Sequence, residues 1–183
     1  MPGLLQNHIA VITGAGSGIG RAIATLFASE GAHVFVTDLN GESADVAARA
    51  LSGQGLKATA MTVDVSRGQD VTALFREVER AFGRADVVVN NAGLNVRSDF
   101  RHLSDADWVK IREVNLDGVV RIARDAFGLL KDPELATTIE FPVSRLRLVM
   151  LDGSATVPST VIAPVEPALP NTSVEAVMLS SDA

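Results

Sequence analysis

A glycine-rich turn near the start of the chain has the residue types and spacing that bind a pyrophosphate. The turn reads Thr13-Gly14-Ala15-Gly16-Ser17-Gly18-Ile19-Gly20, between an apolar segment and a helical pattern. Glycines allow a tight turn and a close approach of the backbone, and the amino end of the helix offers free N–H groups to phosphates. We therefore predict a phosphate site here rather than an ordinary strand-to-helix loop. The expected contact residues are Gly14, Ser17, Gly18, Ile19 and Gly20.

A carboxylate follows at a position suited to an adenosine ribose. Asp38 ends the next apolar segment after Gly20, close to the spacing of about 20 residues at which an acidic side chain meets the ribose hydroxyls. A carboxylate accepts hydrogen bonds from both hydroxyls and repels a 2′-phosphate. The neighbours Thr37 and Leu39 are not basic, and neither is Ser17. Asp38 therefore favours NAD over NADP, and the alternative is a solvated loop aspartate.

Two more motifs end predicted strands at the same edge of the sheet. Asp64 and Val65 can contact an adenine, through a carboxylate for its amine and an apolar wall for its ring, although an aspartate can also simply terminate a strand. In Asn90-Asn91-Ala92-Gly93, amides can tie neighbouring strands together while small residues admit a ligand. The expected ligand contacts in this motif are Asn91, Ala92 and Gly93.

Asn115 lies on an apolar helical stripe, four residues from both Ile111 and Val119. A buried amide needs partners, because an unpaired one costs about 1–3 kcal/mol. Asn115 is thus either a satisfied core residue or a polar group that faces an active site.

Alternating strands and helices must position these residues. We expect strands at 8–12, 32–37, 56–63 and 85–89, and helices from the glycine turn to Gly31, at 42–52, at 71–82 and at 104–130. Apolar strands linked by right-handed helical crossovers form a doubly wound parallel sheet of the α/β class, with helices on both faces. The first helix is expected to bury Ile19, Ile23, Leu26 and Phe27. The last is expected to bury Trp108, Ile111, Gly118, Val119, Ile122, Ala126 and Phe127.

The character of the chain changes after Lys131. Six of the seven prolines and only one of the fifteen glycines lie in this part, and spaced prolines argue against helices. We expect residues 1–130 to form a dinucleotide-binding domain and 131–183 to form a divergent tail with one strand at 145–151.

Composition excludes several classes of function. The net charge of −6 disfavours nucleic-acid partners. Cysteine is absent, so disulfides and thiolate ligands are excluded, and the three histidines do not cluster with carboxylates as a metal site requires. No apolar run reaches the roughly 18 residues of a membrane span. The first predicted strand leaves no room for a signal peptide, so we expect a cytoplasmic protein.

Together these motifs resemble the short-chain dehydrogenase/reductase family over residues 5–130. The matching pieces are Thr13-Gly14-x-x-x-Gly18-x-Gly20, Asp38, Asp64-Val65, Asn90-Asn91-Ala92-Gly93 and Asn115. The resemblance implies a Rossmann-type fold, here truncated to about four or five strands, a nicotinamide cofactor, and hydride exchange between a small-molecule alcohol and a ketone. It implies that Asn115 belongs to an Asn-Ser-Tyr-Lys catalytic set, its backbone carbonyl holding a water of the proton relay. It also implies a homo-oligomer that associates through the long helix after Ser104.

The sequence departs from that family at the catalytic pair. It contains no tyrosine, and its lysines are Lys57, Lys110 and Lys131. Ser154 is a weak match to the family's serine. Carbonyl reduction needs a proton donor near the oxygen. In the family the lysine helps to lower the pKa of the tyrosine, and a shift of about 3 units takes roughly 4 kcal/mol of interaction. Neither group of this pair is available here.

Three interpretations remain open at this point. The chain is an oxidoreductase by descent with a crippled site, a non-catalytic dinucleotide-binding or interaction protein, or a truncated or frame-shifted product of a full-length dehydrogenase whose sequence diverges after about Lys131. The identity of any substrate is not encoded in these motifs.

Overall fold

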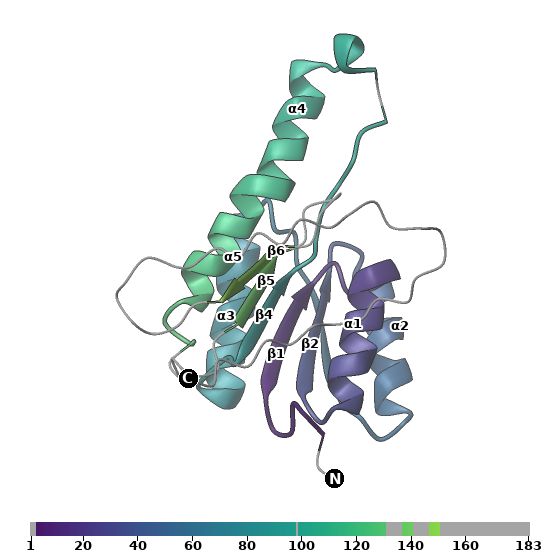
Figure 1. The fold of residues 1–183 in the computed structure, drawn as a ribbon, viewed down its shortest axis with the longest axis vertical. Coiled ribbons are helices and arrows are strands. Elements are labelled where there is room, and N and C mark those ends of the chain that lie inside the picture. The colour runs from purple at the N-terminus through teal and green to yellow at the C-terminus, as the bar shows by residue number, and fades with distance from the viewer. Residues whose placement is uncertain (1–2, 98, 131–136, 141–146, 151–183) are drawn as a thin grey trace.

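The computed structural model of the chain describes residues 3–97, 99–130, 137–140 and 147–150 (Figure 1). Within them the strands are β1 (Ile9–Thr13), β2 (His33–Asp38), β3 (Lys57–Thr62), β4 (Val87–Asn90), β5 (Thr137–Glu140) and β6 (Arg147–Met150). The helices are α1 (Gly18–Ser29), α2 (Gly41–Ser52), α3 (Gly68–Phe82), α4 (Asp105–Arg112) and α5 (Gly118–Ala126). A 3-10 turn, η1 (Phe100–His102), precedes α4, and a π-helical segment, η2 (Glu113–Asp117), joins α4 to α5.

The strands form one sheet in the order β3-β2-β1-β4-β5-β6. The pairs from β3 through to β5 are parallel, with Val11 of β1 opposite Phe35 on one side and Val88 on the other. The predicted α/β class and doubly wound parallel sheet are confirmed. Since parallel strands share a direction, the loops that follow β1, β2, β3 and β4 all leave from the same edge of the sheet.

The far end of the sheet differs from expectation. β5 was not predicted, and the sheet therefore has six strands instead of four or five. The strand expected at 145–151 is present as β6. It does not pair with β4, because β5 pairs with β4 and β6 runs antiparallel to β5. The β-branched run of Thr137, Thr138 and Ile139 favours a strand, and an antiparallel neighbour requires no helical crossover. The rest of the expected tail lies outside the described residues.

Helices cover both faces of the sheet (Figure 1). Ile9 and Val11 pack with α3 and α5, whose large side chains include Leu74, Phe75 and Ile122. Ala10 and Ile12 pack on the other face with α1 and α2, where alanines dominate the helix contacts. Burial on both faces explains why the strands are continuous apolar runs.

The buried face of α1 is not the predicted one. Ile19 and Leu26 are 68% and 49% exposed, and Ile23 and Phe27 are only partly buried. The buried residues are Gly20, Ala24 and Ala28. Small residues let the helix axis approach the sheet closely, so the contact is made by a stripe that large apolar side chains do not mark.

The predicted long helix contains a π-helical segment that changes which residues it buries. Ser104 caps it as expected, since its Oγ accepts a hydrogen bond from Asp107 N at 3.1 Å. Gly118, Ile122 and Ala126 are buried, whereas Trp108 and Phe127 are 54% and 70% exposed. A π-helical turn holds extra residues and rotates the stripe that follows it. α4 has no buried residue and extends past the edge of the sheet (Figure 1).

Candidate functional site

The glycine turn lies at the carboxyl end of β1 and leads into α1. Gly14 and Gly18 have left-handed φ angles of 64° and 54°, which glycine adopts without strain. Gly20 faces the carbonyl oxygen of Gly14 and the Asn91 side chain so closely that a Cβ there would collide with both. The turn is fastened to β2 by a hydrogen bond from Ala15 N to Thr37 O at 2.8 Å.

The space in front of the α1 amino end fits a phosphate group. A Cβ added to Gly18 would meet nothing within 4 Å. Ser17 is exposed and extended at the N-cap position, and its hydroxyl makes no capping hydrogen bond. The first N–H groups of a helix carry partial positive charge and lack intrahelical partners. A dinucleotide's pyrophosphate therefore has both room and donors at this turn.

Thr13 and Asn91 join the glycine turn to the loop that follows β4. The Thr13 hydroxyl accepts hydrogen bonds from Asn91 N and Ala92 N, both at 3.0 Å, and contacts Val89 O at 3.3 Å. The Asn91 amide donates to Thr13 O at 2.9 Å and to Gly14 O at 3.0 Å. Because Thr13 is 1% exposed, this junction is a buried part of the frame, and Gly93 beyond it is exposed.

Asp38 lies against the glycine turn. Its Oδ2 accepts a hydrogen bond from Gly16 N at 2.9 Å, and its Oδ1 accepts one from Asn40 N at 2.9 Å. A carboxylate has about four acceptor positions, so two remain for a ligand. The side chain is partly exposed and forms no ion pair with any described residue.

Asp64 and Val65 follow β3 and have different surroundings. Asp64 Oδ1 accepts hydrogen bonds from Ser66 N at 2.9 Å and Ser66 Oγ at 2.7 Å, so the carboxylate supports its own turn. Val65 is 6% exposed, and its side chain packs against Gly118 of α5. The partly exposed group at this position is therefore the Asp64 carboxylate.

Asn115 lies within the π-helical segment and holds the same loop as Asn91. Its Oδ1 accepts from Leu94 N at 2.8 Å, and its Nδ2 donates to Leu94 O at 2.9 Å. Both polar groups of the side chain are thus paired with one backbone unit. The backbone pairing of a π segment is irregular, and such segments occur frequently at functional sites.

The structure brings most of the predicted site residues to one edge of the sheet. The glycine turn itself contains Gly14, Ser17, Gly18 and Gly20, and beside it lie Asp38, Asn91 and Ala92. Ile19 is exposed beside them, and Ser154 lies outside the described residues. Sequence reasoning assigned no role to Thr13, whose buried hydroxyl joins two strands. The amide of Asn90 was expected to help tie neighbouring strands together, but Asn90 is 3% exposed and its Nδ2 has no hydrogen-bond partner among the described residues.

Neither a metal-binding cluster nor a membrane-spanning helix is found among the described residues. No group of three or more His, Cys, Asp or Glu side chains among them is arranged to hold a metal ion. None of the helices in the described ranges has the length and apolarity needed to cross a bilayer.

This chain is similar to known proteins over the part that contains these site residues. The family model for short chain dehydrogenases matches residues 8–139. The chain is 37% identical over 123 residues to the 3-oxoacyl-(acyl-carrier-protein) reductase FabG of Chlamydia trachomatis, covering 67% of this chain and 50% of that protein. It is 42% identical over 115 residues to the meso-2,3-butanediol dehydrogenase of Serratia marcescens, covering 63% of this chain and 45% of the relative.

A solved structure has the same arrangement. The crystal structure of a short-chain dehydrogenase/reductase, titled glucose/ribitol dehydrogenase, from Brucella melitensis superposes with a TM-score of 0.68 at 35% identity. The match covers 73% of this chain and 56% of that one. The chain thus spans about half the length of the relatives named here.

Proposed function

We propose that this chain, which belongs to the short-chain dehydrogenase family of oxidoreductases, binds NAD(H) with the pyrophosphate over the amino end of α1. The observation that carries the proposal is the open, left-handed Gly18 beside the uncapped Ser17. Gly14, Ile19 and Gly20 complete the turn, and Asn91, Ala92 and Gly93 form its neighbouring wall. In the family, such a cofactor supplies or accepts a hydride in exchange between an alcohol and a ketone.

Asp38 supports a preference for NAD(H) over NADP(H). Gly16 N and Asn40 N hold its carboxylate, which keeps acceptor capacity for the ribose hydroxyls and would repel a 2′-phosphate. Asp64 and Val65 are the proposed neighbours of the adenine, with the Asp64 carboxylate as the polar contact. Asn115 is a proposed positioning residue, because its side chain holds Leu94 N and Leu94 O in the loop after β4.

Tyrosine, the proton donor of the family, is absent from the sequence, and this supports a site that binds the cofactor without turning over an alcohol. Lys57 begins β3 at the opposite edge of the sheet, and Lys110 forms an ion pair with Asp107 on α4. Neither described lysine is placed to support a proton transfer beside the glycine turn. A non-catalytic dinucleotide-binding protein is therefore the second candidate function.

A pair of glycine substitutions tests the binding proposal. Gly18 and Gly55 both have left-handed φ angles and open surroundings, so alanine at either position costs a similar free energy of about 1 kcal/mol. We expect NADH, followed by fluorescence, to bind Gly18→Ala at least about tenfold more weakly. Gly55→Ala should bind like the unaltered protein. Equal affinity of the two variants would show that the turn does not hold the cofactor.

The proposal that the site binds the cofactor without turnover is tested with a panel of alcohols and ketones. We expect no oxidation or reduction above background with NAD or NADH, because general acid–base catalysis requires a group within hydrogen-bond reach. Robust turnover that Asn115→Ala abolishes would show that another residue replaces the tyrosine, and the proposal of a non-catalytic site would be wrong.

The helical segment from α4 to α5 supports self-association. Its exposed large apolar residues are Trp108, Val109, Leu116, Val120 and Phe127. Extended apolar surfaces of this kind mark interaction sites, and we propose a homo-oligomer that buries this one. Light scattering should find dimers or larger species at micromolar concentration. Leu116→Glu should shift them toward monomers, and a stable monomer of the unaltered chain would contradict the proposal.

A further inference from the structure

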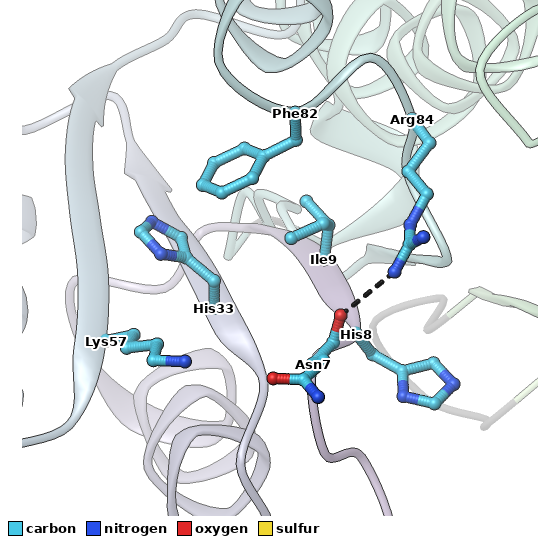
Figure 2. A pocket seen from close by; sticks show the side chains of 7 residues that line it. All are labelled: Asn7, His8, Ile9, His33, Lys57, Phe82 and Arg84. Carbon is cyan, nitrogen blue, oxygen red and sulfur yellow. Dashed lines mark hydrogen bonds between the residues drawn. The ribbon is translucent and has the colours of Figure 1, made fainter.

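A cavity of about 210 Å³ opens at the edge of the sheet opposite the glycine turn (Figure 2). Its walls come from the starts of three neighbouring strands and from the end of α3. His33 and Lys57 begin β2 and β3, Asn7 precedes β1, and Phe82 and Arg84 lie at and after the end of α3. None of these residues belongs to the proposed cofactor site.

One wall of this cavity is aromatic. The rings of Phe82 and His33 have centroids 4.6 Å apart, and Phe35 supports both from the core at 5.8 Å and 5.6 Å. His33 Nε2 is hydrogen-bonded to Thr59 Oγ1 at 2.8 Å, which fixes the orientation of the imidazole. Phe82 is 38% exposed. The wall is thus a fixed apolar surface that a flat ring can cover.

Two cationic side chains, Lys57 and Arg84, also line the cavity. Lys57 extends toward Asn7 from one side, and Arg84 reaches the Asn7 carbonyl oxygen at 3.0 Å from the other (Figure 2). Arg84 is partly neutralised by Asp86, at 3.1 Å. Lys57 forms no ion pair with a described residue, and the residues that line the cavity include no carboxylate.

The same surroundings act on the pKa of His33. Burial lowers the pKa of His33 below its usual value of 6.5, and the charge of Lys57 lowers this pKa further. The described groups facing the imidazole are Lys57 and Thr59 from β3, Phe35 from β2 and Phe82 from α3. Of these only Lys57 is charged, so it would attract an anion, and none of the other groups would repel that anion.

We propose that this cavity is a second binding site, for a small aromatic carboxylate. The ring of the ligand lies against Phe82 and His33, and the carboxylate is directed toward Lys57, with Arg84 on the far side. The apolar wall supplies contact area for the ring, and the charge selects an acid over a neutral aromatic molecule. Because this cavity and Asp38 lie at opposite edges of the sheet, the cavity is separate from the proposed cofactor site.

Titration with benzoate, followed by NMR of the His33 and Phe82 ring protons, tests this site. We expect saturable shifts, weaker shifts with acetate, which lacks a ring, and weaker shifts with benzyl alcohol, which lacks a charge. Benzoate should also raise the pKa of His33, since a nearby anion favours the imidazolium form. A merely apolar pocket would not move this pKa.

Matched lysine variants sharpen the test. Lys57 and Lys110 are both exposed, so replacing either with glutamine should leave the fold intact. Lys57→Gln should weaken benzoate binding about two- to fivefold, the upper part of the range for one exposed charge pair, and Lys110→Gln should not change it. Non-saturating shifts, equal binding of benzyl alcohol, or equal effects of the two variants would each overturn the proposal.

Discussion

The two ends of β1 are held by different chemistry. At the carboxyl end, Thr13 and Asn91 connect strands through neutral hydroxyl, amide and backbone groups. At the amino end, the buried Asp86 carboxylate accepts a hydrogen bond from Ile9 N at 2.7 Å and pairs with Arg84. His33 and Lys57 lie along the same amino edge.

This difference has a consequence for ligand binding. Coulombic interactions act over many ångströms in a medium of low dielectric constant. Thr13 and Asn91 hold the glycine turn to the loop after β4 with neutral groups, so the carboxylate beside the proposed ligand is Asp38, which also accepts from Gly16 N. The ion pair of Asp86 with Arg84 lies at the opposite edge of the sheet, and this difference leads to predictions for each end.

The largest expected effect is at the carboxyl end. Thr13→Val removes the hydroxyl that Asn91 N and Ala92 N donate to, which leaves Ala92 N without its acceptor and Asn91 N with only Val89 O, at 3.1 Å. We expect a loss of about 2–4 kcal/mol in the free energy of unfolding, since an unpaired N–H costs about 1–3 kcal/mol and each further lost hydrogen bond about 0.5–1.5 kcal/mol. Urea denaturation measures the loss. Thr13→Ser keeps the hydroxyl and should lose only about 1 kcal/mol; equal losses would show that the methyl group matters more than the hydrogen bonds.

A smaller loss is expected at the amino end. Asp86→Ala leaves Ile9 N without its acceptor and Arg84 without its partner. Hydrogen bonds to charged groups contribute about 1.5–3 kcal/mol, so urea denaturation should show a loss of about 2 kcal/mol. Asp86→Asn retains an acceptor oxygen and should recover part of it. If Asp86→Ala unfolds like the unaltered chain, the carboxylate does not hold the start of β1.

The smallest expected effect is a pH dependence of stability at the amino edge. The pKa of His33 is lowered in the folded protein, so below pH 6.5 the unfolded chain binds more protons than the folded protein does. Stability should therefore be full above that pH and decline toward the folded-state pKa. Thermal unfolding of His33→Gln should lack this decline, whereas His102→Gln, at an exposed position, should keep it. A decline that survives in His33→Gln would have to come from another group.

The sequence predicts the first four strands and the glycine turn well, because these features depend on residues that are neighbours in the sequence. Continuous apolar runs mark strands covered on both faces, and the glycine pattern requires a turn that Gly14 and Gly18 do adopt. The partners of Asn115 could not be predicted in the same way. Its stripe indicates only that the amide needs hydrogen bonds, and Leu94 is brought to it by tertiary packing.

Two errors in the helices have physical causes. Large apolar residues were expected to mark the buried face of α1, whereas Ala24 and Ala28 are buried because small residues permit the closest packing. Trp108 was expected inside because an uninterrupted helix was assumed to lie against the sheet, whereas α4 buries no residue and extends past the edge of the sheet (Figure 1). The π segment at Glu113–Asp117 changes the phase between α4 and α5, and no residue type signals it in a single sequence.

The most direct test of the account is the cofactor preference assigned to Asp38. Calorimetric titrations with NADH and NADPH are compared for the unaltered protein, Asp38→Ala, and Asp45→Ala, which removes an exposed carboxylate of α2. We expect NADH to bind the unaltered protein and Asp45→Ala about 10- to 100-fold more tightly than NADPH, the range for hydrogen bonds to a charged group. Asp38→Ala should lose most of that difference. Equal or tighter binding of NADPH to the unaltered protein would contradict the account.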